Sequence, residues 1–255
     1  MNTEKTMKKL LILFIIVVCT IDGFAQDADP SQTNTVVYIQ NSTRLADQAD
    51  VFSVFDEYER PILNRLVEEG ALLGYGQMSH SWGDVFNHNV YYVAENKTAF
   101  FEAWSKFFSE LDLDNELMQE TQRKINKHKD NIYVHTAFYG NGVVSPGTVM
   151  INQNRVNFAD QGEWVSLFRE YAYPILKAMV DEGKMNRFGL LLHEWGDEWN
   201  VNYYIHTDNQ EQFHESWGEY IARFQSDHPD VLRRIVDLTI DHKDNLLYER
   251  IPQQD

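Results

Sequence analysis

The chain contains the same sequence twice. Residues 36–104 align with residues 149–217 at a constant offset of 113, without a gap, and 28 of the 69 aligned pairs are identical. Pro61-Ile62-Leu63, for example, returns as Pro174-Ile175-Leu176. Self-similarity at a fixed period indicates a repeated structural unit, so the two copies are expected to share one fold. The duplication constrains the architecture far more than it constrains the function.

Each copy predicts the element order strand–helix–strand–strand–helix–strand. Residues 35–40 and 148–153 are β-branched and aromatic, as first strands are. An amphipathic helix follows in each copy, and its apolar residues recur at three- and four-residue steps. Pro61 and Pro174 fall inside this helical pattern, where each either starts a second helical segment or kinks a longer one.

The second half of each copy predicts a hairpin, a helix and a closing strand. The hairpin strands are residues 72–80 with 90–94, and 185–193 with 201–206. Aromatic residues at helical spacing then predict a strongly amphipathic helix, followed by a shorter charged helix. The motif His128-Lys129-Asp130-Asn131 and its copy His242-Lys243-Asp244-Asn245 are interpreted as the end of that charged helix and a turn, before closing strands at 132–138 and 246–251.

This order is the ferredoxin-like arrangement, a four-stranded antiparallel sheet with both helices on one face. The other sheet face is apolar and must be covered, and a second copy packed sheet to sheet is the natural cover. The chain thus resembles the dimeric α+β barrel superfamily, in which two ferredoxin-like units form one barrel. The resemblance covers both repeats and rests on the element order and the duplication. The predicted fold class is α+β, with two tandem βαββαβ repeats forming a pseudo-dimeric barrel.

The predicted organisation has five parts. Residues 1–25 read as a signal peptide, because Lys8 and Lys9 precede a short apolar run and small residues stand before a cleavage point after Ala25. Residues 26–34 form a polar, flexible lead-in, and residues 139–147 form a Gly- and Pro-containing linker between repeat 1 (35–138) and repeat 2 (148–251). The expected location is therefore periplasmic or secreted, with no membrane insertion after cleavage.

Charge and cysteine content exclude several functions. The formal net charge is −17, so the surface repels phosphate backbones and anionic membranes, and nucleic acid is not an expected partner. The single cysteine, Cys19, lies in the signal, which leaves the mature protein without a disulfide, a thiol nucleophile or a thiolate metal site. No phosphate-binding loop, dinucleotide fingerprint or nucleophile elbow is present, so the cofactor is unknown.

The most distinctive motif is His80-Ser81-Trp82-Gly83-Asp84, which returns as His193-Glu194-Trp195-Gly196-Asp197. In the functional interpretation, His80 or His193 transfers protons with Asp84 or Asp197 beside it, while Trp82 and Trp195 wall an apolar pocket. In the structural interpretation, Gly-Asp forms a turn, the indole anchors the loop to its own domain and the imidazole is hydrogen-bonded at a strand end. Retention in both copies favours the structural one, because catalytic sites usually survive duplication in one half.

Strand alternation separates Tyr75, Gln77 and Ser79 from Gly76, Met78 and His80. If the first set lines the barrel interior, repeat 1 supplies polar groups and repeat 2 an apolar wall, and these three residues become candidate ligand contacts together with the two tryptophans. The His193-Glu194 stretch lacks the second histidine of a zinc-binding helix, so no metal is expected.

Three functions remain open from the sequence. The first is an exported, non-catalytic protein that binds a small apolar or aromatic molecule between its repeats. The second, implied by the resemblance, is a barrel enzyme of the cofactor-free oxygenase, isomerase or haem type that uses His80 or His193. The third is an acidic protein-interaction module of the cell envelope. Further association into a homo-oligomer is compatible with all three.

Overall fold

The computed structural model describes residues 33–140 and 146–250. The predicted signal peptide and most of the lead-in, the middle of the predicted linker and the last five residues lie outside this range. Each half contains the predicted strand–helix–strand–strand–helix–strand order. Among the described helices, none is long and apolar enough to cross a membrane.

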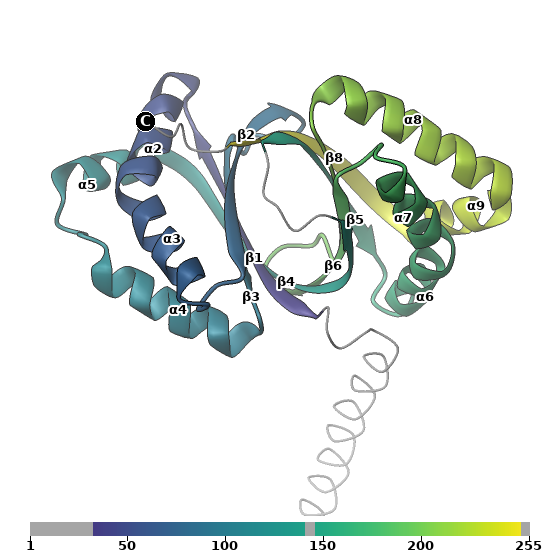
Figure 1. The fold of residues 1–255 in the computed structure, drawn as a ribbon, viewed down its shortest axis with the longest axis horizontal. Coiled ribbons are helices and arrows are strands. Elements are labelled where there is room, and N and C mark those ends of the chain that lie inside the picture. The colour runs from purple at the N-terminus through teal and green to yellow at the C-terminus, as the bar shows by residue number, and fades with distance from the viewer. Residues whose placement is uncertain (1–32, 141–145, 251–255) are drawn as a thin grey trace, which may run out of the picture.

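Repeat 1 comprises β1 (Asn34–Thr43), α2 (Gln48–Val54), α3 (Arg60–Glu68), β2 (Gly74–Trp82), β3 (His88–Ala94), α4 (Lys97–Glu110), α5 (Glu116–Arg123) and β4 (Ile125–Gly140). Repeat 2 comprises β5 (Gly147–Val156), α6 (Gln161–Leu167), α7 (Tyr173–Asp181), β6 (Arg187–Trp195), β7 (Val201–Thr207), α8 (Gln210–Asp227), α9 (Pro229–Leu238) and β8 (Thr239–Arg250). The helices of the two repeats flank a central barrel on opposite sides (Figure 1).

The first helix of each repeat contains one turn of π-helix. Phe55–Glu59 joins α2 to α3, and Phe168–Ala172 joins α6 to α7. Each π turn ends directly before the helix that carries the proline in its first turn, where the missing N–H costs no hydrogen bond. The sequence left open whether each proline starts a second helical segment or kinks a longer helix. In the structure each proline lies in the first turn of a new segment, and the π turn joins that segment to the preceding helix.

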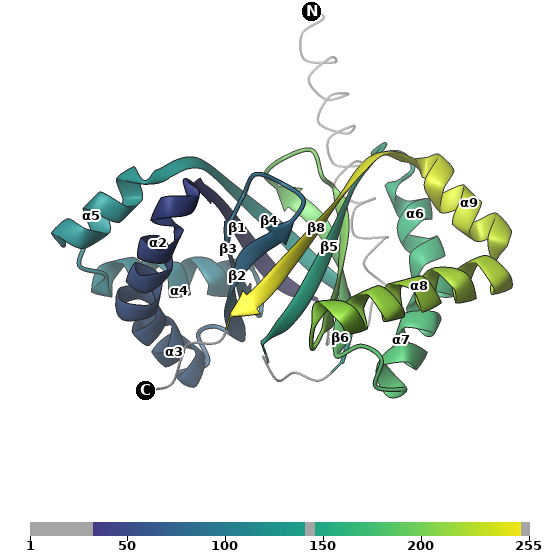
Figure 2. The same ribbon diagram turned by 90° about the horizontal axis from the view of Figure 1, so that it is seen from above.

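Eight antiparallel strands close into one barrel in the order β1-β3-β2-β8-β5-β7-β6-β4. Within each repeat the strands keep ferredoxin-like neighbours, and the edge strands of one sheet pair with those of the other. These two pairings, β2 with β8 and β4 with β6, are called the seams below. The predicted sheet-to-sheet packing is thus a closed barrel that leaves neither sheet with an unpaired edge, which removes a site for aggregation (Figure 2).

Three apolar clusters hold the molecule together. One lies between the helices and the sheet of repeat 2, and a second between the helices and the sheet of repeat 1. The third lies inside the barrel and combines residues of both repeats: Val36, Tyr38, Met78, Tyr133, Val149, Ile151, Leu191 and Leu247. The barrel interior is therefore a shared core of the two repeats, and its filling determines whether a ligand can enter.

Two predicted details of this fold are wrong. His128-Lys129-Asp130-Asn131 and His242-Lys243-Asp244-Asn245 lie within β4 and β8, not at helix ends. The charged helices α5 and α9 end before these motifs, at Arg123 and Leu238. Both motifs start long strands because their backbones pair with β1 and β5, and such pairing is set by tertiary contacts, not by the local preference of Asp-Asn for turns.

Candidate functional site

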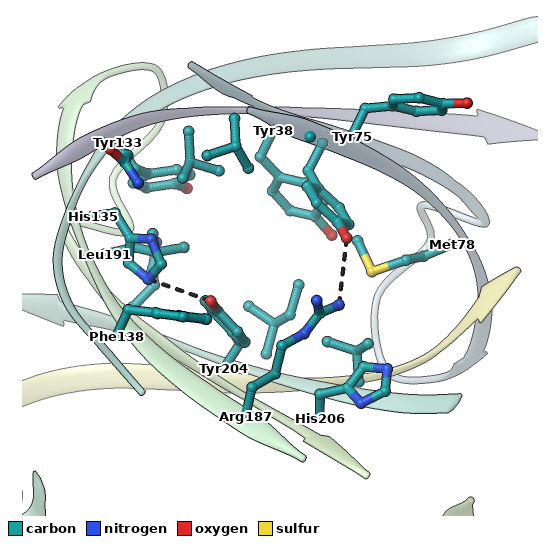
Figure 3. A pocket seen from close by; sticks show the side chains of 18 of the residues that line it. Tyr38, Tyr75, Met78, Tyr133, His135, Phe138, Arg187, Leu191, Tyr204 and His206 are labelled. Carbon is teal, nitrogen blue, oxygen red and sulfur yellow. Dashed lines mark hydrogen bonds between the residues drawn. The ribbon is translucent and has the colours of Figure 1, made fainter. Parts of the chain in front are cut away.

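The barrel contains a cavity of about 340 Å³. Its lining is mostly apolar and comes from all eight strands, with a single residue, Glu249, from β8. The apolar wall is formed by side chains of both repeats, namely Val36, Met78, Val93, Val149, Ile151 and Leu191. Polar groups gather at two places, one around Arg187 near the start of β6 and the other around Tyr133 and Gln153 (Figure 3).

Two glycines in the barrel strands leave space for tyrosine rings of the neighbouring strands. A Cβ on Gly76 would overlap the ring of Tyr91, and a Cβ on Gly189 would overlap the ring of Tyr204 and the His135 imidazole. The two glycines are equivalent in the repeats, as are the two tyrosines. Each glycine therefore lets an aromatic ring lie flat across its strand. This arrangement places the Tyr91 and Tyr204 hydroxyls at the cavity.

A buried charged cluster lies at the first polar place. Arg187 Nη2 donates to Glu249 Oε2 at 2.7 Å, and His206 Nε2 lies 3.1 Å from the same oxygen. The Tyr91 hydroxyl donates to the other carboxylate oxygen. The side chains of Glu249 and His206 are 0% and 1% exposed, and the Arg187 guanidinium points into the cavity (Figure 3). These four groups are called the charged cluster below.

The hydrogen bonds of the cluster keep the Glu249 carboxylate ionised. Asn186 Nδ2 donates to Asp208 at 2.7 Å, so its second hydrogen is directed to His206 Nδ1 at 3.2 Å. Both ring nitrogens of His206 are therefore engaged, Nδ1 by Asn186 and Nε2 by Glu249. Burial alone would raise the pKa of Glu249, but the His206 hydrogen bond and the Arg187 charge outweigh it and lower the pKa. Arg187 and Glu249 thus form a buried ion pair within the cluster.

A second pair, His135 and Tyr204, lies on the wall beside the cluster. Their Nε2 and hydroxyl atoms are 3.3 Å apart. Burial, together with the nearby Arg187 charge, lowers the pKa of His135 to about 4, so the imidazole is neutral at physiological pH. Burial raises the pKa of Tyr204, which keeps its hydroxyl protonated. Both groups are therefore uncharged in the cavity wall.

The duplicated motifs meet across the seams. The Asp84 N–H donates to Asn245 Oδ1 at 2.8 Å, and the Asp197 N–H donates to Asn131 Oδ1 at 3.0 Å. Lys243 likewise pairs with Asp84 at 2.5 Å and Lys129 with Asp197 at 3.2 Å. Each His-x-Trp-Gly-Asp loop is therefore held by the His-Lys-Asp-Asn motif of the other repeat. The contacts give both motifs a role in closing the barrel, whereas a catalytic role for Asp84 and Asp197 stays a prediction.

The histidines and tryptophans of these motifs separate. His80 borders the outer groove beside α2, and the His193 ring lies 5.9 Å from that of Tyr133. The Nε2 atoms of both histidines are buried without a hydrogen-bond partner among the described residues. Burial lowers the pKa of both. Trp82 and Trp195 are instead 76% and 60% exposed, so they neither wall the cavity nor anchor the loops to their own domains. A register shift between His80 and Trp82 turns the Trp82 side chain away from the inward face of β2, and a corresponding shift lies between His193 and Trp195 in β6.

The predicted inward face of β2 is wrong. Gln77 faces the helices, where it accepts from buried Arg60 at 3.3 Å, and Met78 of the opposite face lines the cavity. Ser79 lies in an outer groove beside α2. Tyr75 reaches only the rim, and its hydroxyl points away to donate to Asn64 (Figure 3). Both faces of this strand carry polar residues, so alternation alone could not decide which one is buried in the barrel.

The sequence interpretation missed the charged cluster and the His135–Tyr204 pair. A signal existed in the comparison of the two repeats. Three inward positions of repeat 2 hold Arg187, His206 and Glu249, where repeat 1 has Gly74, Val93 and His135. Burying a charged residue in a largely apolar interior costs desolvation free energy. A charge present in only one of the two repeats is therefore more readily explained by function than by stability.

The cavity does not fit a haem held by histidine. His135 Nε2 lies within hydrogen-bond distance of the Tyr204 hydroxyl, and His206 Nε2 of Glu249, so neither Nε2 atom is free for an iron in the interior. His80 and His193 do not line the cavity. Within the described ranges, no group of three His, Cys, Asp or Glu residues is placed to hold a metal ion.

Comparison with known proteins identifies the fold. No protein-family model and no curated protein matches the sequence. A candidate monooxygenase from Fusobacterium nucleatum superposes with a TM-score of 0.59 at 10% identity, over 86% of this chain and 93% of that one. A candidate monooxygenase from Lactobacillus acidophilus gives 0.54 at 13% identity, over 86% and 94% of the chains.

A mutant chlorite dismutase from Candidatus Nitrospira defluvii, in complex with cyanide, gives a TM-score of 0.54 at 8% identity, over 86% of this chain and 91% of that one. At such identities the likeness shows a shared fold alone. It confirms the predicted architecture, and the chain has the fold of the dimeric α+β barrel proteins.

Proposed function

We propose that the protein binds a small, mainly apolar molecule inside its barrel. The observation that carries this proposal is a mostly apolar cavity of about 340 Å³ with a buried ion pair at one end. Small-molecule sites typically have volumes of this order and combine apolar walls with a few placed polar groups. The predicted signal peptide further suggests that binding takes place outside the cytoplasm.

The asymmetry of the repeats supports a role for the charged cluster in binding. A buried ion pair seldom stabilises a protein more than apolar residues of the same volume would. Repeat 1 forms the same sheet with Gly74, Val93 and His135 at the equivalent positions. Because folding does not require the charges, we attribute Arg187 and Glu249 to orienting a ligand.

The charge balance suggests the class of ligand. Glu249 already pairs with Arg187, and both ring nitrogens of His206 are engaged by Glu249 and Asn186, so an additional anion would find no unpaired cation in the cluster. The Arg187 guanidinium still has more N–H groups than Glu249 and Tyr91 engage. It can therefore donate to a polar atom of an uncharged molecule that fills the apolar part of the cavity.

Catalysis has less support than binding. Monooxygenases and a chlorite dismutase share the fold, so chemistry in such a barrel is a reasonable alternative. A general base works best with a pKa near the working pH, but the pKa of His135 is about 4. His80 and His193, the candidates from the sequence, have lowered pKa values and do not line the cavity.

Filling the cavity tests the proposal. We expect the protein to bind one equivalent of 2-methylnaphthalene, measured by titration of the probe's fluorescence. Val149→Phe places a ring in the apolar wall and should weaken binding at least tenfold, whereas Leu45→Phe, at a position 82% exposed, should leave it unchanged. Leu191→Phe repeats the test on another strand, and thermal melting identifies variants that fail to fold. Equal binding by Val149→Phe, Leu191→Phe and the parent protein would refute an interior site.

A further inference from the structure

Near Tyr133, the cavity wall contains the side-chain amide of Gln153, and hydrogen bonds determine which way this amide is oriented. The Asp84 N–H donates to Asn245 Oδ1, so the Asn245 amide nitrogen must face the other way. That nitrogen donates to Gln153 Oε1 at 3.0 Å. Gln153, which lines the cavity, therefore presents Nε2 as a donor. Gln153 is 0% exposed, and its Nε2 atom is buried without a hydrogen bond of normal geometry to any described residue.

Repeat 1 shows what such an amide contacts. Gln40 is the equivalent of Gln153, and its Nε2 lies 3.5 Å from the Tyr38 hydroxyl. That hydroxyl in turn donates to Asn89 at 3.0 Å. In repeat 2, Ile151 stands at the position of Tyr38, so no phenol of that strand reaches Gln153. Both Ile151 and Gln153 line the cavity, so part of the cavity wall lies where repeat 1 has a tyrosine.

A second polar group faces the same place from β4. Tyr133 lines the cavity and is 1% exposed, and its hydroxyl faces the side-chain amides of Gln153 and Asn202 without completing a hydrogen bond of normal geometry with either. Burial raises the pKa of Tyr133, which keeps the hydroxyl protonated. Gln153 Nε2 and the Tyr133 hydroxyl thus face each other, and neither completes a hydrogen bond of normal geometry, although buried polar groups nearly always do so with protein, water or ligand.

We propose that Gln153 and Tyr133 bind an uncharged oxygen of the ligand, a phenolic hydroxyl or a carbonyl. The inference rests on the proposed function and names its ligand class, an aromatic molecule with an oxygen at its inner end. Gln153 Nε2 donates to this oxygen, much as Gln40 approaches the Tyr38 hydroxyl. A carboxylate is disfavoured, because Lys129 and Lys243 of the seams are already paired with Asp197 and Asp84.

Two probes of similar shape test the inference. Binding of 2-naphthol and 2-methylnaphthalene is measured with the parent protein, Gln153→Met, Tyr133→Phe and the matched control Gln40→Met. The parent should prefer 2-naphthol about tenfold, the value of a well-formed hydrogen bond. Gln153→Met and Tyr133→Phe should reduce the preference to about twofold or less, with 2-methylnaphthalene still bound. Gln40→Met removes the equivalent amide outside the cavity lining and should keep the preference.

The outcomes separate the two proposals. Binding of both probes with equal affinity by the parent overturns the oxygen site and leaves the proposed function intact. Failure of both probes to bind overturns the proposed function itself. A preference that survives in both Gln153→Met and Tyr133→Phe also overturns the inference. A crystal structure with 2-naphthol should show its oxygen between the two side chains, and an ordered water there, with the naphthol oxygen elsewhere, overturns it as well.

Discussion

At the scale of single residues, the barrel interior differs from an ordinary core because it buries titratable groups. Glu249 remains ionised there only through its hydrogen bonds with His206 and Tyr91 and the Arg187 charge. His135 is buried there as a neutral imidazole, because burial and the nearby Arg187 charge lower its pKa to about 4. These groups connect the cavity to the stability of the protein, because their protonation differs between the folded and unfolded states.

The stability of the protein should therefore fall in acid. An unfolded histidine takes up a proton below a pKa of about 6.5, whereas folded His135 resists protonation down to about 4. Between these values the unfolded state binds more protons, so His135 alone should remove about 3 kcal/mol of unfolding free energy as the pH falls from 7 to 4. The lowered pKa of Glu249 acts in the same direction at still lower pH.

Urea unfolding at a series of pH values measures this effect. His135→Gln should flatten the decline between pH 7 and pH 4 relative to the parent protein. His214→Gln, on the exposed surface of α8, serves as the control and should keep the parent slope. Parallel curves for the parent and His135→Gln would show that the buried histidine does not control this pH dependence.

At the scale of the elements, the cavity exists because two strands contain glycine where an aromatic ring from the next strand crosses them. Gly76 lies under Tyr91 and Gly189 under Tyr204. A side chain at either position would push the ring into the cavity or displace the strand. The same pattern recurs at Gly147, where a Cβ would overlap His206. Glycine thus shapes the site without contacting a ligand.

Gly189→Ala should destabilise the protein by roughly 1–3 kcal/mol, because the new methyl group overlaps Tyr204 and His135. Gly218→Ala is the matched control. A Cβ at Gly218, within α8, would contact nothing within 4 Å, and the substitution should add roughly 0.5–1 kcal/mol of helix stability. Thermal melting compares them, and a Gly189→Ala variant as stable as Gly218→Ala would contradict the packing described here.

The order of the elements was predictable from sequence, whereas the inward-facing residues were not. Hydrophobic periodicity and the duplication were sufficient for the βαββαβ order and the barrel. Which face of β2 is inward depends on Arg60 of α3, which holds Gln77 on the helix side. The partners of Asp84 and Asp197 lie in the opposite repeat, beyond the reach of any local pattern. The differences between repeats at Arg187, His206 and Glu249 were readable but required the strand register.

At the scale of the whole molecule, duplication gives two things at once. Identical motifs form the two seams, where each loop of one repeat is held by a strand of the other. Different residues at equivalent inward positions give a cavity with the charged cluster at one place and the Gln153 amide, whose Nε2 makes no hydrogen bond of normal geometry among the described residues, at another. What the repeats share thus closes the barrel, and what they do not share makes its interior a candidate ligand site. Association into a homo-oligomer remains a prediction.

The central claim, that the barrel interior is the ligand site, is tested most directly by a crystal structure with 2-bromonaphthalene. Anomalous scattering locates the bromine without reference to any expected pose. The account predicts one bromine inside the barrel, surrounded by Val149, Ile151 and Leu191. A fully occupied bromine only in the outer groove between α2 and β8, or no ordered bromine in the interior at saturating probe, would contradict it.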